Sequence, residues 1–150
     1  MSDDVFIRPA QAGDLPAIVA LLAGAGLPPA GVEQWLPRFV VAERAGAVVA
    51  AAGLEIYGRA ALLRSVVVAV EGRGRGLGAA LTERIATEAA RAGARMLYLL
   101  TTTAPAYFPR LGFRTIERAE LPEALAASEE LKGACPASAI VMARPLSGRA

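Results

Sequence analysis

A glycine-rich turn between an apolar run and an amphipathic helix is the feature that most constrains this fold. Glycine occupies every second position from Gly72 to Gly78, after an almost continuous apolar run at residues 60–70. Beyond the turn, apolar residues recur at every fourth position: Leu77, Leu81, Ile85 and Ala89. This spacing predicts a helix over residues 77–92, and the apolar run predicts a strand that is covered on both faces and central in its sheet.

The same turn predicts a binding chemistry. Glycines let successive N–H groups converge on an anion without obstruction by Cβ atoms, and the following helix adds free N–H groups and the positive end of its dipole. A pyrophosphate is the ligand that fits such a turn. Arg73 and Arg75 stand where they can add charge-assisted contacts to its oxygens, although arginines at so exposed a turn can also be simply solvated.

Two other nucleotide-binding loops have different signatures. A Walker A loop ends in Gly-Lys followed by Ser or Thr, and the chain contains no such tripeptide. A dinucleotide loop reads G-x-G-x-x-G, whereas Gly74, Gly76 and Gly78 alternate, and the next predicted strand ends in threonines instead of a ribose-binding acid. A dinucleotide-binding module therefore stays open only as a minor alternative.

The order of the predicted elements indicates one mixed α/β (α+β) domain over residues 1–150. Turn residues and apolar periodicity predict a strand at 5–7, helices at about 15–24 and 32–36, and three antiparallel strands at 39–45, 47–57 and 60–70. After the glycine turn and its helix, the pattern predicts a strand at 96–100, a small helix at 105–110, a lid-like helical insertion at 120–132 and strands after Gly112 and at 139–144. The sheet is therefore expected to be mixed, mostly antiparallel and flanked by helices.

The composition argues against several classes of function. Lys and Arg number 16 against 14 Asp and Glu, and the resulting net charge of +2 gives no broad basic field for nucleic acid. The chain has no histidine and a single cysteine, Cys135, so a metal site and a histidine-activated nucleophile are both disfavoured. The acidic start and the lack of a long apolar run predict a cytoplasmic protein without a membrane span.

The spacing Arg73-x-x-Gly76-x-Gly78 after an apolar strand resembles the acetyl-CoA signature R/Q-x-x-G-x-G/A of the GNAT N-acetyltransferases. Residues 107–113 are similar to the aromatic segment of that family that ends in Gly-Phe, and the order of elements agrees over residues 5–145. The resemblance implies acetyl-CoA as the cosubstrate, a small-molecule amine as the acceptor, and a sheet whose central strands splay apart.

The resemblance also implies positions for the cosubstrate. The backbone at Val66 and Val68 would pair with the pantetheine arm, while their side chains are equally expected in the core, and the thioester would lie near Thr101 and Phe108. The turn would hold the pyrophosphate through these positions: Arg73, Gly74, Arg75, Gly76, Leu77, Gly78 and Ala79.

A narrower resemblance concerns residues 61–66, 99–103 and 135–139, which are similar to the acetyltransferases encoded with arsenic-resistance operons. This resemblance implies a small amino-acid-like or arsenical acceptor. The oligomeric state stays open, with a homodimer among the alternatives.

Acetyl transfer to an amine requires an acceptor for the amine proton, stabilisation of the oxyanion and protonation of the CoA thiolate. Glu55, near the end of its strand, is the candidate base, against the alternative of an exposed strand-end carboxylate. The tyrosine acid usual in the resembled family corresponds to Phe108 here, so Tyr107 is the substitute candidate although it lies about 100° around a helix. Phe108 also motivates a second hypothesis, an acyl-CoA-binding sensor without turnover.

Four further positions are candidates for binding the acceptor. Arg64, on the central strand, either binds a substrate carboxylate or forms a structural ion pair, and Ser65 follows it directly. Trp35 is either core packing or a wall of the pocket. Cys135 is either a small buried side chain or part of a segment that lines the pocket.

Overall fold

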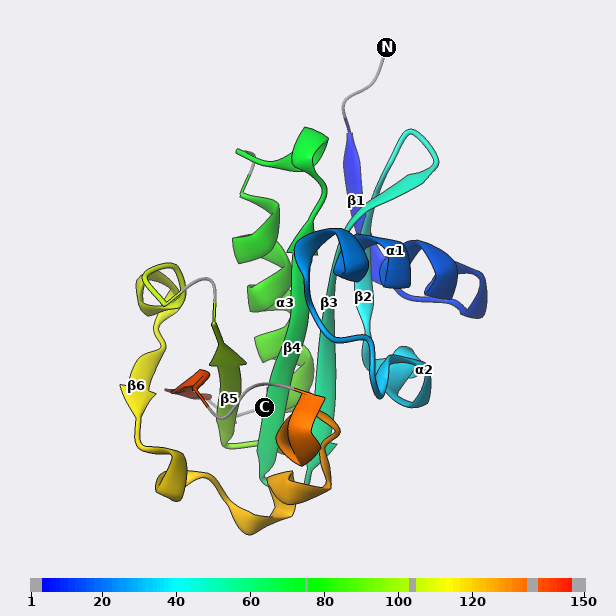
Figure 1. Ribbon diagram of the computed structural model, residues 1–150. Coiled ribbons are helices and arrows are strands. Elements are labelled where there is room, and N and C mark those ends of the chain that lie inside the picture. The colour runs from blue at the N-terminus through cyan, green and yellow to red at the C-terminus, as the bar shows by residue number, and fades with distance from the viewer. Residues whose placement is uncertain (1–3, 75, 103–104, 135–137, 147–150) are drawn as a thin grey trace.

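The computed structural model describes residues 4–74, 76–102, 105–134 and 138–146, which build one seven-stranded sheet in the order β1-β2-β3-β4-β5-β7-β6 (Figure 1). The strands are β1 (Val5–Pro9), β2 (Val40–Arg44), β3 (Ala47–Tyr57), β4 (Ala60–Val68), β5 (Met96–Thr101), β6 (Arg114–Ile116) and β7 (Ile140–Pro145). The helices are α1 (Leu15–Ala25), α2 (Val32–Trp35) and α3 (Leu77–Arg91). Short helical turns are η1 (Ala12–Asp14), η2 (Leu36–Arg38), η3 (Val70–Gly72), η4 (Phe108–Leu111), η5 (Arg118–Glu120), η6 (Glu123–Ala127) and η7 (Glu130–Ala134).

The predicted mixed, mostly antiparallel sheet with flanking helices is confirmed. In the described residues, the β4–β5 pair is parallel and the other five strand pairs are antiparallel. The position of β4 as the fourth of seven strands confirms that the most apolar run lies at the centre of the sheet. Its side chains are buried along nearly its whole length, as expected for a strand covered on both faces.

The helices cover opposite faces of the sheet because successive side chains of a strand alternate in direction. On β2, Val40 and Ala42 pack into the cluster that contains the inner face of α3, whereas Val41 packs with α1 and α2. Figure 1 shows α3 behind the central strands and α1 in front of them. The front face is completed beside β5 by residues 121–131, whose Leu125 is fully buried.

A β-bulge in the β3–β4 pairing lies just beyond the point where β4 stops pairing with β5. Ala51 pairs with Val67 and Gly53 pairs with Arg64, so two residues of β4, Ser65 and Val66, stand opposite one residue of β3. Ser65 has a positive φ of 61°, which bends the strand at this point. The β4–β5 pairing covers only three residue pairs, Ala60 to Leu62 with Met96 to Tyr98, and the two strands diverge beyond it (Figure 1). The expected splay is therefore present and has a local cause.

Three elements differ clearly from the sequence predictions. The central strand ends at Val68 instead of residue 70, because the chain turns into η3 before the glycines. The small helix predicted at 105–110 begins at Phe108, after Pro105 and the turn that follows it. The insertion at 120–132 contains no regular α-helix but a series of short turns, in which the periodic leucines fill the gap beside the sheet instead of marking a helix face.

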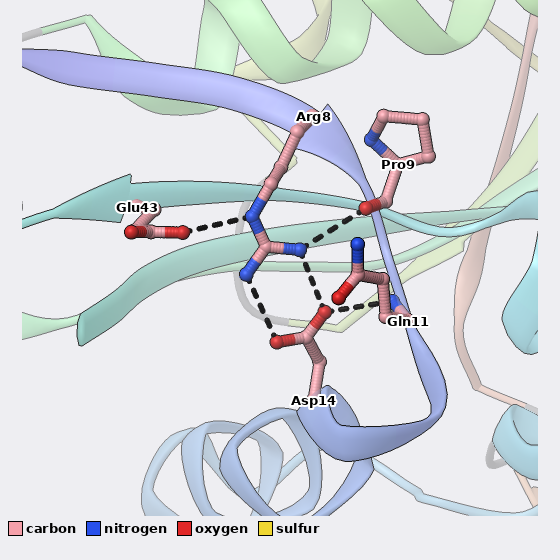
Figure 2. A network of polar contacts seen from close by, with 5 residues as sticks. All are labelled: Arg8, Pro9, Gln11, Asp14 and Glu43. Atoms are coloured by element: carbon pink, nitrogen blue, oxygen red, sulfur yellow. Dashed lines mark hydrogen bonds and ion pairs between the residues drawn. The ribbon is translucent and has the colours of Figure 1, made fainter. Parts of the chain in front are cut away.

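An ion-pair network at the edge of the sheet fixes how the chain enters α1 (Figure 2). Arg8 on β1 makes two hydrogen bonds of 2.8 and 3.0 Å to the Asp14 carboxylate and a third of 2.8 Å to Glu43 on β2. Asp14 also accepts the backbone N–H of Gln11 at 2.7 Å. The hydrogen bonds from Arg8 hold the pKa of Asp14 below its usual value, so the carboxylate stays ionised and ties η1 to the edge strand.

Gly53 on β3 is required by close packing. The ring of Phe39, which is 1% exposed, lies so near that a Cβ atom at Gly53 would be 2.2 Å from its Cζ. The bulge of β4 begins opposite this position, so the ring and the glycine backbone fit together where the sheet bends. A side chain here has no room without movement of Phe39.

We predict that Gly53→Ala lowers the free energy of unfolding by about 1–3 kcal/mol, because the added methyl group overpacks the core against Phe39. Gly24→Ala is the matched control, since Gly24 lies in α1 with open space around it and alanine there gains about 1 kcal/mol of helix propensity. Urea unfolding of both variants measures the difference. A Gly53→Ala protein as stable as the unchanged chain would contradict this account of the packing.

Candidate active site

A pocket of about 900 Å³ opens between the diverging halves of β4 and β5. Its walls come from the loop after α1, the bulged half of β4, the glycine turn, the end of β5 and η4. It brings together most of the predicted site residues that the structure describes: Arg64, Ser65, Val66, Val68, Arg73, Gly74, Gly76, Leu77, Gly78, Thr101, Tyr107 and Phe108. A cleft formed where strand pairing stops therefore collects positions that are distant in the sequence.

The glycine turn forms one end of this pocket. Gly74 and Gly76 adopt left-handed conformations with φ of 82° and 73°, and Gly76 is the N-cap residue of α3. A Cβ atom at either glycine would meet nothing within 4 Å, so the backbone there borders open space. The free N–H groups at the start of the 15-residue helix α3 also lie at this end, which makes it suited to an anion.

Arg73 lies on the rim of the same end. Its side chain is exposed and its Nε donates a hydrogen bond of 3.2 Å to the carbonyl of Val68 at the end of β4. The guanidinium therefore stands beside the turn and keeps other donors for a ligand. Arg75, the second predicted arginine, lies outside the described residues.

The two adjacent aromatic side chains at η4, Phe108 and Tyr107, have different surroundings. Phe108 is 8% exposed and packs edge to face against Phe113, with ring centroids 5.8 Å apart, as part of the main core. The hydroxyl of Tyr107 lies over Gly78, where a Cβ atom would come within 2.6 Å of it. Tyr107 thus lines the pocket at the first turn of α3, and burial raises the pKa of its hydroxyl.

The charged centre of the pocket wall is an ion pair inside the sheet. Arg64 has a fully buried side chain and donates from Nη1 to Glu55 Oε2 at 2.9 Å, from Nε to Ser65 Oγ at 2.9 Å and from Nη2 to the carbonyl of Pro28 at 3.0 Å. Of the two predicted roles of Arg64, the structure therefore shows the structural ion pair. Three of its five N–H donors are directed at protein groups, and Arg64 also stands in the pocket lining.

Glu55 is fully buried, so the alternative of an exposed strand-end carboxylate is wrong. Both of its oxygens accept hydrogen bonds, one from Arg64 and the other from the Tyr57 hydroxyl at 2.5 Å. Burial and the Glu55 carboxylate raise the pKa of Tyr57, so the phenol keeps its proton as a donor. A Glu55 carboxylate with both oxygens hydrogen-bonded differs from the free general base that its place near the strand end suggested.

Glu130 at the start of η7 is a buried site residue that sequence reasoning missed. Its side chain is 5% exposed and lines the pocket, and its Oε2 lies 3.6 Å from Arg64 Nε. Burial raises the pKa of this carboxyl to about 7 although the Arg64 charge opposes the shift. No pattern distinguishes Glu130 from Glu129 in the sequence, because long-range packing alone decides which one turns inward.

Other predicted positions lie elsewhere or are not described. Among the described residues, Glu55, Ala79 and Trp35 do not line the pocket. Trp35 packs on Tyr57 with ring centroids 5.5 Å apart, which fits its core-packing alternative. Cys135 lies outside the described residues. Arg110, which was not predicted, adds a further exposed cation to the pocket lining.

Two other kinds of site are absent from the described ranges. They contain no group of three or more His, Cys, Asp or Glu side chains that could hold a metal ion. None of the helices in these ranges combines the length and the apolar character that a membrane span requires.

Comparison with known proteins places the fold and the pocket in a family. The model of the acetyltransferase (GNAT) domain matches residues 36–115, a stretch that includes the bulged strand, the glycine turn and α3, and the chain belongs to this family. The expectation from the Arg73-x-x-Gly76-x-Gly78 signature is thereby confirmed.

Individual relatives are longer proteins or share only the fold. An amino-acid acetyltransferase of Pasteurella multocida is 29% identical over 134 residues, which cover 82% of this chain and 30% of that protein. The N-acetylglutamate synthase of Neisseria gonorrhoeae, solved with coenzyme A and N-acetyl-glutamate, is 25% identical with a TM-score of 0.82 over 97% of this chain and 36% of the other. Rv2747 of Mycobacterium tuberculosis, solved with CoA and NLQ, is 21% identical with a TM-score of 0.78 over 94% and 99% of the two chains. The chain thus spans roughly a third of the first two relatives.

Proposed function

We propose that this chain is an acetyl-CoA-dependent N-acetyltransferase that acetylates a small, amino-acid-like amine by direct transfer in a ternary complex. The observation that carries the proposal is that two features border one pocket. They are the N-terminus of α3, which is suited to an anion, and the bulged, partly unpaired strand β4. Membership of the acetyltransferase family and the likeness to amino-acid acetyltransferases support the reaction and the class of acceptor.

The pocket has matching places for the parts of acetyl-CoA. The open backbone at Gly74 and Gly76 and the first turn of α3 at Gly78 would hold the pyrophosphate through their N–H groups, with Arg73 beside them. The backbone at Val66 and Val68 would pair with the pantetheine arm, because within the described ranges β4 has no partner strand on the β5 side beyond Leu62. The thioester would then lie at the far end, near Thr101 and Phe108.

The transfer balances without a covalent enzyme intermediate. The nitrogen lone pair of the acceptor attacks the thioester carbonyl, a C–N bond forms, and the C–S bond breaks when the tetrahedral oxyanion collapses. A backbone N–H near Val66, freed from the ladder by the bulge, is the proposed oxyanion donor. The CoA sulfur gains one proton as it leaves, and the amine nitrogen loses one.

We predict that Gly76→Asp weakens coenzyme A binding more than tenfold, a cost of about 1.4 kcal/mol or more, because it sets a negative charge at the phosphate end of α3. The fold should persist, since the position is open and aspartate is among the residues that enter the left-handed region most readily. Titration calorimetry with coenzyme A measures the affinity.

Two controls separate charge from backbone strain. Gly76→Asn has the same size without the charge, and Gly93→Asp places the charge at another open, left-handed glycine beyond the far end of α3. Both should retain most of the affinity. Unchanged coenzyme A binding by a folded Gly76→Asp protein would refute the pyrophosphate site.

Turnover is tested by release of free thiol from acetyl-CoA with a panel of amino acids, including glutamate, and simple amines. We expect at least one amine to raise the rate above hydrolysis. The panel should include organic arsenicals, because the narrower resemblance at residues 61–66 and 99–103 proposes them as acceptors. Tight acetyl-CoA binding without turnover on any compound would favour the second candidate, a sensor, which the phenylalanine at position 108 motivates.

Tyr107 is the proposed proton donor to the leaving thiolate, whereas the position of its hydroxyl over Gly78, at the phosphate end of the pocket, also suits cosubstrate binding, so its substitution tests one role against the other. We predict that Tyr107→Phe lowers kcat about tenfold or more while the KM for acetyl-CoA changes little. Steady-state kinetics decide between two roles. A raised KM with unchanged kcat would instead assign the hydroxyl to cosubstrate binding at the helix start.

A further inference from the structure

The buried charges beside the pocket do not balance within the described residues. Arg64 contributes one positive charge, whereas Glu55 and Glu130 contribute two carboxylates, and the exposed fraction of each side chain is 5% or less. A buried charge is costly unless it is paired and hydrogen-bonded. One of the two carboxylates therefore lacks a full counter-charge.

The hydrogen bonds identify Glu130 as that carboxylate. Glu55 accepts from Arg64 and from Tyr57, so both of its oxygens are satisfied. Arg64 Nε donates its only hydrogen to Ser65 Oγ at 2.9 Å, which leaves Glu130 with an ion pair of 3.6 Å and no hydrogen bond to its carboxylate from the described residues. The backbone N–H of Glu130 donates to Ser128 Oγ and so fixes the segment but not the carboxylate.

The groups around Glu130 leave one direction open. Arg64 on β4 and the pair of Glu55 and Tyr57 on β3 are engaged with one another, and Ser128 lies one residue before Glu129 on the same segment. The remaining side of the carboxylate faces the pocket, whose lining includes Ser65 and Val66 of the bulge. A cation that entered the pocket would thus meet Glu130 beside the strand where the thioester is proposed to lie.

We propose that Glu130 binds the acceptor as its ammonium ion and takes a proton from it, so that the substrate class of this site is a primary amine presented as a cation. The inference rests on the proposed acetyl transfer for its catalytic half. Glu55 and Arg64 are positioning residues in this assignment, because they act on the acceptor only through Glu130.

The proton balance is simple. The ionised carboxylate and the ammonium ion exchange one proton, which leaves a carboxylic acid on Glu130 and a neutral amine with a free lone pair. The amine then attacks the thioester, the CoA sulfur takes the proton of Tyr107, and the second proton lost from nitrogen restores the Tyr107 hydroxyl through solvent. Glu130 returns its proton to solvent after product release.

The first test is binding, which does not depend on turnover. Calorimetry with n-propylammonium chloride, in the presence of coenzyme A, compares the unchanged protein with Glu130→Gln. We expect a more than tenfold loss of affinity in the variant and an unchanged affinity for coenzyme A. Glu129→Gln is the matched control, because the adjacent Glu129 side chain packs with its Cβ and Cγ near Gly31 and is not part of the lining of this pocket. Failure of the unchanged protein to bind propylammonium would overturn the proposal.

The second test is kinetic and uses the best amine from the thiol-release panel. Glu130→Gln should lower kcat/KM for the amine about 100-fold, the lower range of general base catalysis. In the unchanged protein kcat/KM should fall as the pH drops below about 7, the pKa of Glu130, since the protonated acid neither attracts nor deprotonates an ammonium ion. Glu130→Asp should keep such an acidic limb, and Glu130→Gln should lose it.

The outcomes separate the two proposals. Wild-type kcat/KM and pH dependence in a folded Glu130→Gln protein would refute Glu130 while leaving the acetyltransferase proposal intact. Propylammonium binding that depends on Glu130, without thiol release from any amine, would refute the proposed activity while leaving Glu130 as the amine receptor.

Discussion

Every part of the candidate site depends on the point where β4 stops pairing with β5. Only three residue pairs join the two strands, and the bulge at Ser65 and Val66 then bends β4 toward β3 and away from its parallel neighbour. The bend leaves strand backbone beside a 900 Å³ pocket instead of inside a ladder. An unbroken β4–β5 ladder would satisfy the same backbone groups but would close the pocket. The loss of pairing on this side of β4 therefore leaves backbone available as a binding surface.

The buried guanidinium of Arg64 holds this opening in shape. It joins β4 to Glu55 on β3, to the carbonyl of Pro28 after α1 and, at longer range, to Glu130. Three segments that are distant in the sequence thereby meet at the bulge. Three of the five N–H donors of Arg64 are directed at protein groups, so the cation braces the pocket wall, and the proposal assigns acceptor recognition to Glu130, the carboxylate to which Arg64 makes no hydrogen bond.

The fold and the phosphate end of the site could be predicted from the sequence because both are encoded by local sequence patterns. Alternating glycines after an apolar strand determine the turn at Gly74 and Gly76, and the four-residue repeat from Leu77 determines α3. The acceptor end has no such local signal. The burial of Glu55 and the inward turn of Glu130 follow from packing between β3, β4 and the segment after Leu125, and adjacent glutamates look equivalent until that packing is known. The role of Phe108 also depends on packing that the sequence does not show. Its ring packs against Phe113 in the core.

The two ends of the pocket have opposite electrostatic character, and this polarity determines how two substrates can share it. The N-terminus of α3, with Arg73 on the rim, presents positive potential to phosphates, whereas Glu130 presents a carboxylate beside Arg64, whose Nε is already hydrogen-bonded to Ser65. An anionic cosubstrate and a cationic amine are therefore drawn to different ends, with the bulged strand between them. Because β4 forms the wall between the two ends, its unpaired stretch is where the acyl group and the amine would meet, and a reversed orientation would place like charges together at both ends.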